Sequence, residues 1–175
     1  MSGERFLYGS MSRERTMTAA RLDSVAKFIC EKGGWQISNL QLQKLLYLSQ
    51  MIHMGQNDGL RLVEADFQAW DYGPVVRQLY SKVRMFGAGP IRDVFYSARP
   101  FKQDDPRRQT LDQICGQLLS YSPAQLVDMT HWPQGAWAKH YVPGLRGIPI
   151  PDEDIRAEYQ LRLAFQSAKR HPEFA

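Results

Sequence analysis

Apolar residues in the first third of the chain recur with the 3.6-residue period that is typical of amphipathic helices. A helix is predicted from Thr18 to the glycine pair at 33–34, because glycine tolerates the left-handed conformation that follows a helix end. A second helix opens at Ser38, which precedes Gln41 at the spacing of a capping box. We expect its buried positions to form a single stripe, made of Leu42, Leu45, Leu46, Ser49 and Ile52.

The helical period disappears over residues 60–72, where the segment ADFQAWDY alternates between two faces. One face carries Phe67 and Ala69, and the other carries Gln68, Trp70 and Tyr72. A short strand or hairpin is therefore predicted, and the pair Gly73-Pro74 turns the chain at its end. Proline suits the first position of a helix because it needs no partner for a backbone N–H. We expect Pro74 to open a third helix that closes at Gly87.

Local signals predict further helices in the second half of the chain. The pair Asp105-Pro106 opens a fourth helix. Ser122 with Gln125 forms a capping box that opens a short fifth helix. Asp152 or Asp154 caps the last helix. Two stretches lack a helical period: residues 88–103, with a short strand expected near 94–97, and an aromatic loop over 130–147.

These elements predict a mainly α (α+β) fold, a compact single helical domain with a short β-strand or hairpin before the Gly-Pro corner. We expect residues 1–16 to be a flexible N-terminal extension, residues 17–165 to form the domain, and residues 166–175 to be a tail whose end, from residue 167, frays. The chain has 175 residues, 43% of them hydrophobic, which suffices for one buried core. No apolar run approaches the about 18 residues of a membrane span, and the first residues lack the apolar stretch of a secretory signal. We therefore expect a cytoplasmic protein that does not enter a membrane.

Candidate catalytic groups are few. Cys30 and Cys115 lie within apolar helical patterns and are expected to be buried structural residues. His131 and His140 could meet in one loop and bind a metal, although a hydrogen-bonded structural role is the favoured interpretation. Lys44, beside the leucine stripe, could be a catalytic amine, but we expect it to extend along the core with its head in water. The chain is predicted to have no enzymatic activity, no metal site and no cofactor.

The charge balance leaves a nucleic-acid partner open. The chain has 22 Lys+Arg and 18 Asp+Glu, and the formal net charge is +4. Arg77, Arg84 and the pair Arg107-Arg108 could contact phosphates, so a DNA-binding transcriptional regulator, acting on its own operon, is the alternative function. The paired carboxylates at 104–105 and 152–154 precede predicted helices, where negative charge complements the helix dipole.

The aromatic residues favour a protein-binding module instead. Several of them lie in predicted turns, and protein interfaces use Trp, Tyr and Arg as anchors. The residues concerned are Trp70, Tyr72, Tyr80, Trp132 and Trp137.

Three stretches, in order, resemble motifs of the Panacea family, the SocA-like antitoxin domain that is also found in phage-associated GepA proteins. The segment LQLQKLLYLSQMIH (40–53) is similar to the family's helix motif and keeps Leu42, Gln43, Lys44, Leu45, Leu46, Tyr47 and Gln50. The segment FQAWDYGPVVRQLY (67–80) resembles its Gly-Pro corner and keeps Phe67, Ala69, Trp70, Tyr72, Gly73, Pro74, Val75 and Tyr80, with Gln68 where glutamate is usual. The segment LVDMTHWPQGAW (126–137) keeps Thr130, His131 and Trp137, with Ala136 where proline is typical. The resemblance extends from about Met17 to Tyr159.

The resemblance implies an antitoxin that neutralises a cognate protein toxin by direct binding. It also implies a second mode, in which the antitoxin is an adaptor that delivers the toxin to a ClpXP-type AAA+ protease. Among the motif residues, we expect seven to be structural: Leu42, Gln43, Lys44, Leu45, Gly73, Pro74 and Val75. Six others combine an apolar body with a polar tip and are expected to line a toxin-binding groove: Tyr47, Trp70, Tyr72, Tyr80, His131 and Trp137.

Overall fold

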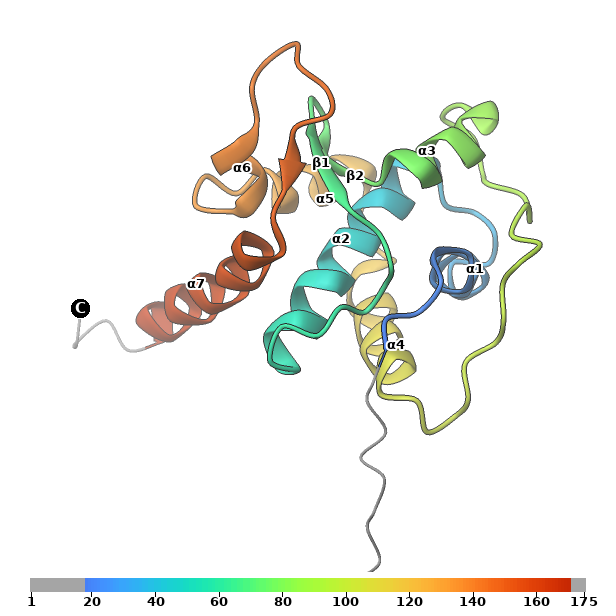
Figure 1. Cartoon of the computed structure of the whole chain (residues 1–175), viewed down its shortest axis with the longest axis horizontal. Coiled ribbons are helices and arrows are strands. Elements are labelled where there is room, and N and C mark those ends of the chain that lie inside the picture. Colours follow the sequence, from blue (N-terminus) through green and yellow to red (C-terminus); the bar gives the residue numbers. More distant parts are fainter. Residues whose placement is uncertain (1–17, 171–175) are drawn as a thin grey trace, which may run out of the picture.

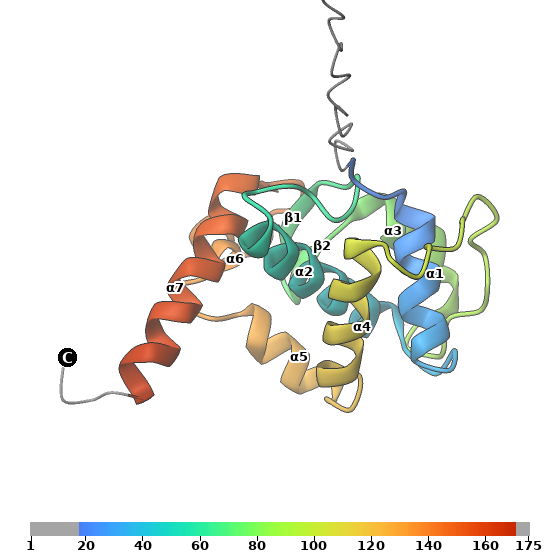
Figure 2. The same cartoon turned by 90° about the horizontal axis from the view of Figure 1, so that it is seen from below.

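Helix α2 (Asn39–Gln56) runs through the middle of the molecule, and the other elements pack around it (Figures 1 and 2). The computed structural model describes residues 18–170. Helices α1 (Leu22–Lys32) and α4 (Pro106–Leu118) cover one side of α2, and α7 (Asp152–Arg170) covers another (Figure 2). Helix α5 (Pro123–Thr130) also contacts α2. The predicted mainly α fold with a small β element is confirmed.

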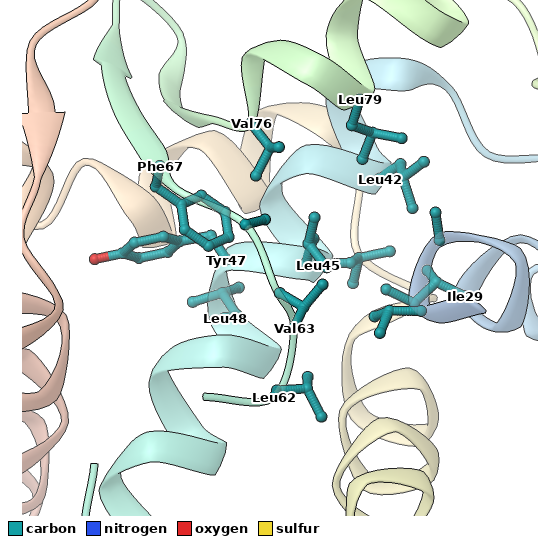
Figure 3. Packing of buried hydrophobic residues seen from close by; sticks show 14 of the residues in the cluster. Ile29, Leu42, Leu45, Tyr47, Leu48, Leu62, Val63, Phe67, Val76 and Leu79 are labelled. Atoms are coloured by element: carbon teal, nitrogen blue, oxygen red, sulfur yellow. The ribbon is translucent and has the colours of Figure 1, made fainter. Parts of the chain in front are cut away.

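Because it is surrounded, α2 is buried on nearly every face. The predicted stripe is confirmed at Leu42, Leu45, Leu46 and Ser49, and Ile52 is only partly buried. A single stripe was nevertheless too narrow a prediction, since buried polar side chains lie between these leucines. Figure 3 shows the apolar cluster that joins α2 to α1, to the segment around Val63 and to the sheet. Cys30 and Cys115 belong to the same core, as expected.

The β structure is a three-stranded antiparallel sheet with the order β2-β1-β3. Strands β1 (Phe67–Trp70) and β2 (Gly73–Val75) form a hairpin, in which Trp70 pairs with Gly73 across a two-residue turn. The predicted alternation is confirmed, because Phe67 and Ala69 are buried while Gln68 and Trp70 are partly exposed. Strand β3 (Pro149–Ile150) was not predicted, since two residues carry no periodic signal.

Pro74 does not open a helix, which corrects the sequence prediction. It pairs with Ala69 inside β2, and α3 (Arg77–Val83) begins only after Val76. Strand β2 lies at the edge of the sheet, where the missing N–H of proline is tolerated. Helix α3 continues as a 3-10 turn, η1 (Arg84–Phe86), which ends at Gly87 as predicted.

Most predicted helix starts are confirmed. Asp105 caps α4 through the backbone N–H of Arg107, with Pro106 at the first helical turn. Ser122 and Gln125 form the capping box of α5. The last helix begins at Asp152, so Asp152 and Asp154 both lie inside it and neither is its N-cap; their carboxylates pair with Arg61 and Lys139.

Three predictions for irregular segments were wrong. The aromatic loop contains a short helix, α6 (Ala136–His140), whose five residues are too few to show a period. Residues 94–97 form no strand. Helix α7 continues to Arg170, beyond residue 167, where fraying was expected. The expected N-terminal extension at 1–16 and the end of the tail lie outside the described residues.

No helix within residues 18–170 combines the length and the hydropathy required to cross a membrane.

Candidate partner-binding groove

A groove of about 360 Å³ lies between the start of α2, the turn of the β1–β2 hairpin, α3 and the loop at 141–148. Three of the six predicted partner-binding residues line it: Trp70, Tyr72 and Tyr80. The rings of Trp70 and Tyr80 pack against each other with centroids 4.9 Å apart. The side chain of Tyr72 is 70% exposed, although it is a large aromatic residue. Three of the predicted residues therefore meet at one groove, from the end of a strand, a turn and a helix, and their role in partner binding stays a prediction.

Arg146 completes the groove and was missed by sequence analysis. Its guanidinium lies over the ring of Trp70, 4.7 Å from the centroid, at cation–π distance. The residue stands in the loop that Figure 1 shows beside the tip of the hairpin. Nothing in the local sequence around Arg146 indicated this contact, because it depends on how the loop folds back between α6 and β3.

Trp70 is fixed in place by two hydrogen bonds. Its indole Nε1 donates to Oε1 of Gln68 at 3.0 Å, and its backbone oxygen accepts from Nε1 of Trp137 at 2.8 Å. The ring of Trp70 thus lies in the groove, while Trp137 of α6 holds the backbone of Trp70.

His131 and Trp137 form a separate stack that supports the hairpin. Their rings are parallel, with centroids 3.8 Å apart, and Trp137 stacks in turn on Tyr141. The hydroxyl of Tyr141 donates to Oδ1 of Asp71 in the hairpin turn at 2.8 Å. Trp137 is buried, and neither it nor His131 lines the groove. Burial lowers the pKa of His131, and the charge of Lys44 lowers it further.

His131 and His140 have different partners in the structure. His140 contacts Oδ2 of Asp154 on α7, whereas His131 stacks on Trp137. Within residues 18–170, no group of three or more His, Cys, Asp or Glu side chains is placed to hold a metal ion.

Lys44 lies in the lining of the groove. The sequence prediction that its ammonium group extends into water was wrong. The side chain is 0% exposed, and its Nζ donates to the backbone oxygen of Pro74 at 2.9 Å. Burial lowers the pKa of Lys44 from its ordinary value of 10.5 to about 7. No acidic side chain within the described part of the chain forms a salt bridge with it. Gly73 of β2 packs directly against the end of the Lys44 side chain, which leaves its ammonium group no exposed surface.

Gln43, the neighbour of Lys44, holds the same segment. Its Oε1 accepts from the backbone N–H of Val76 at 2.9 Å, directly before α3. Gln50 lies about two turns further along α2. Its Oε1 accepts from the backbone N–H groups of Leu62 and Val63 at 2.9 and 3.1 Å. These motif residues therefore connect α2 to the backbone of the segments packed on it.

Tyr47 is not part of the groove, so the expectation that it lines the partner-binding surface was wrong. Its ring is fully buried in the core, and Figure 3 shows its hydroxyl pointing out of the cluster toward α7. The hydroxyl donates to Oε2 of Glu158 at 2.6 Å. Burial and the negative charge of Glu158 raise the pKa of Tyr47 well above its ordinary value.

Glu158 is a buried carboxylate that sequence analysis missed. It also accepts from the backbone N–H of Ala136 and from the guanidinium of Arg162 one turn further along α7. The spacing of Glu158 and Arg162 was visible in the sequence, but it is equally typical of an exposed helix pair. Only the fold places the pair against Tyr47.

A family model described as "Antitoxin SocA-like, Panacea domain" matches residues 42–138 of the chain. The match contains most of α2, the hairpin, Tyr80 and the His131–Trp137 stack, whereas Arg146 and α7 lie beyond it. No curated protein and no solved structure matched the chain.

Proposed function

The chain belongs to the SocA-like antitoxin family, and from this membership we propose that it neutralises a protein toxin by binding it directly in the groove formed by Trp70, Tyr72, Tyr80 and Arg146. It does so in the cytoplasm and without catalysing a reaction. The observation that carries the proposal is the exposure of Tyr72, whose ring stands in solvent beside the Trp70–Tyr80 pair.

The composition of the groove supports a protein partner. Trp, Tyr and Arg are the residues that most often act as energetic anchors of protein interfaces. Here all three types converge in one concave site, where Gln68 holds the ring of Trp70 and Trp137 holds its backbone oxygen. A rigid aromatic surface loses little conformational entropy when a partner covers it, and this favours binding.

The test compares two exposed tyrosines on different parts of the molecule. Tyr72 lies in the groove, and Tyr96 is 91% exposed in the segment between η1 and α4. Each is changed to Ala in a chain that is co-expressed with the protein encoded by the adjacent gene. We expect Tyr72→Ala to lose co-purification and growth rescue, because truncation of an interface anchor costs roughly 2 kcal/mol or more.

The control Tyr96→Ala is expected to bind and rescue as the wild type does. Both variants should melt within about 2 °C of the wild type, since neither ring is buried. Full rescue by Tyr72→Ala would contradict the proposal.

Direct binding is common to two antitoxin modes, sequestration and delivery to a ClpXP-type protease. The half-life of the toxin distinguishes them. Sequestration leaves the half-life of the bound toxin unchanged or longer when the protease is active. Delivery shortens it, and the shortening disappears in cells that lack the protease.

A further inference from the structure

We propose that the groove binds a carboxylate, which an acidic side chain of the protein partner supplies beside an apolar or aromatic neighbour. Arg146 is the cationic group that receives it, and Lys44, buried in the lining of the groove, adds positive charge from below. The inference deepens the proposed function, and it rests on that function only for the statement that the partner is a toxin.

The charge of the groove is positive. Its lining contains three charged residues: Lys44, Asp71 and Arg146. Asp71 already accepts a hydrogen bond from the hydroxyl of Tyr141 at 2.8 Å. The lining thus contains one carboxylate and two basic side chains, of which Lys44 is buried, and an entering anion would offset the excess of basic groups.

Lys44 is a buried basic group, and no acidic side chain within residues 18–170 forms a salt bridge with it. Its ammonium group has three donor hydrogens, and the described contacts use one of them, to the oxygen of Pro74. An ionised group that is buried without an opposite charge is costly, which is the reason that burial lowers its pKa to about 7. A carboxylate at the floor of the groove would favour the charged form of Lys44.

Arg146 is placed to form a forked contact. Its guanidinium stacks on Trp70, so the planar group is oriented and its N–H edge remains available. Within residues 18–170, no acidic side chain forms a salt bridge with it. A guanidinium prefers a carboxylate, which it can bind with two parallel hydrogen bonds.

The aromatic walls define the rest of the ligand. Trp70, Tyr72 and Tyr80 offer ring faces and edges, and Val75 adds an aliphatic contact. An aromatic or apolar group can pack there while the adjacent carboxylate meets the guanidinium of Arg146. Charge and shape together therefore fit an acidic side chain and an adjacent apolar or aromatic side chain on the surface of the protein partner.

Phenylacetate is the probe that tests this inference, and phenylacetamide is its matched neutral control. The two molecules have nearly the same shape and differ in charge. Binding is followed by NMR through the indole N–H signal of Trp70, which is assigned by its loss in Trp70→Phe. We expect phenylacetate to shift this signal and to bind at least about fivefold more tightly than phenylacetamide, the size expected for one ion pair.

The variant Arg146→Gln should abolish the preference for phenylacetate, and Lys44→Met should reduce it. Arg92→Gln is the control, because Arg92 is also an exposed loop arginine but lies outside the groove. The inference is overturned by equal binding of the two probes, by an unchanged preference in Arg146→Gln, or by the absence of a Trp70 shift up to the solubility limit of phenylacetate.

This experiment is independent of the antitoxin assay. A protein that binds phenylacetate as described but fails to rescue growth would keep the carboxylate site and lose the proposed function. A protein that rescues growth but shows no preference for phenylacetate would keep the proposed function and lose the carboxylate site.

Discussion

Four buried polar side chains of α2 bond segments that pack around the helix. Gln43 and Lys44 hold the hairpin and the start of α3, Gln50 holds the segment at 62–63, and Tyr47 holds α7. A buried polar group that loses its partner costs about 1–3 kcal/mol, so these bonds favour one arrangement of the surrounding elements over others. The motif of this helix thus encodes connections within the fold.

The variant Tyr47→Phe tests this structural role. It removes the hydroxyl that donates to Glu158 and leaves the ring in the core. We expect the free energy of unfolding to fall by about 1.5–3 kcal/mol, the range for a hydrogen bond to a charged group. Urea denaturation measures the loss. The folded variant should bind the toxin as tightly as the wild type, and weaker binding at unchanged stability would return Tyr47 to the interface.

Lys44 makes the stability of the protein depend on pH. Its pKa falls from 10.5 in the unfolded chain to about 7 in the folded one, because of burial. Between these values the unfolded chain holds a proton that the folded chain has released, so stability rises as the pH is raised from about 7 toward 10.5.

Lys44→Met removes this contribution while it preserves an apolar stem. The wild type should therefore gain stability relative to the variant between pH 7 and about pH 10, as measured by urea denaturation at both values. A difference between the two proteins that stays constant over this range would show that Lys44 keeps its ordinary pKa.

The β1–β2 hairpin is the element on which the groove depends. Its tight turn requires Gly73, whose φ of +101° lies in the region that favours glycine. A Cβ at this position would approach Oγ1 of Thr130 to 2.8 Å and Nζ of Lys44 to 3.0 Å. Backbone conformation and close packing therefore both select glycine here.

Gly73→Ala is expected to destabilise the protein by about 1–3 kcal/mol, through backbone strain and displacement of its neighbours. Gly116→Ala is the matched control, because Gly116 lies on the exposed side of α4, where an added Cβ would meet no other atom within 4 Å. Alanine favours a helix over glycine by roughly 0.5–1 kcal/mol, so the control should be neutral or more stable. Thermal unfolding of the two variants separates these outcomes, and equal melting temperatures would contradict the assigned role of Gly73 in the hairpin.

Helix starts could be predicted from the sequence because capping is local. Ser38 with Gln41 and Ser122 with Gln125 are each three residues apart, and both boxes form as expected. The turn at Pro74 was harder, because proline is acceptable both in the first turn of a helix and on an edge strand. Strand pairing with Ala69 decided between them, and no local pattern reveals that pairing.

Only the part of the groove whose residues are close in the sequence could be predicted. Trp70, Tyr72 and Tyr80 are close in the sequence and meet in space. Arg146 and the partners of Lys44 and Tyr47 are distant along the chain, so their contacts depend on the packing of whole elements.

The molecule as a whole extends beyond the span of the family match. Helix α7 lies outside residues 42–138, yet it packs on α2 and supplies the buried Glu158. In the first turn of α7, Asp152 forms a salt bridge with Arg61 and Asp154 forms one with Lys139. Helix α7 is therefore an integrated part of the structure around α2. The hairpin and the 141–148 loop lie together at the partner-binding groove.

Hydrogen–deuterium exchange of the chain, alone and in complex with the protein encoded by the adjacent gene, tests the central claim most directly. We predict that the partner slows exchange at residues 68–76 and 141–148, which border the groove, and leaves α1 and the segment at 98–105 unchanged. Protection of α1 and that segment, with the hairpin and the loop exchanging as in the free protein, would contradict this claim.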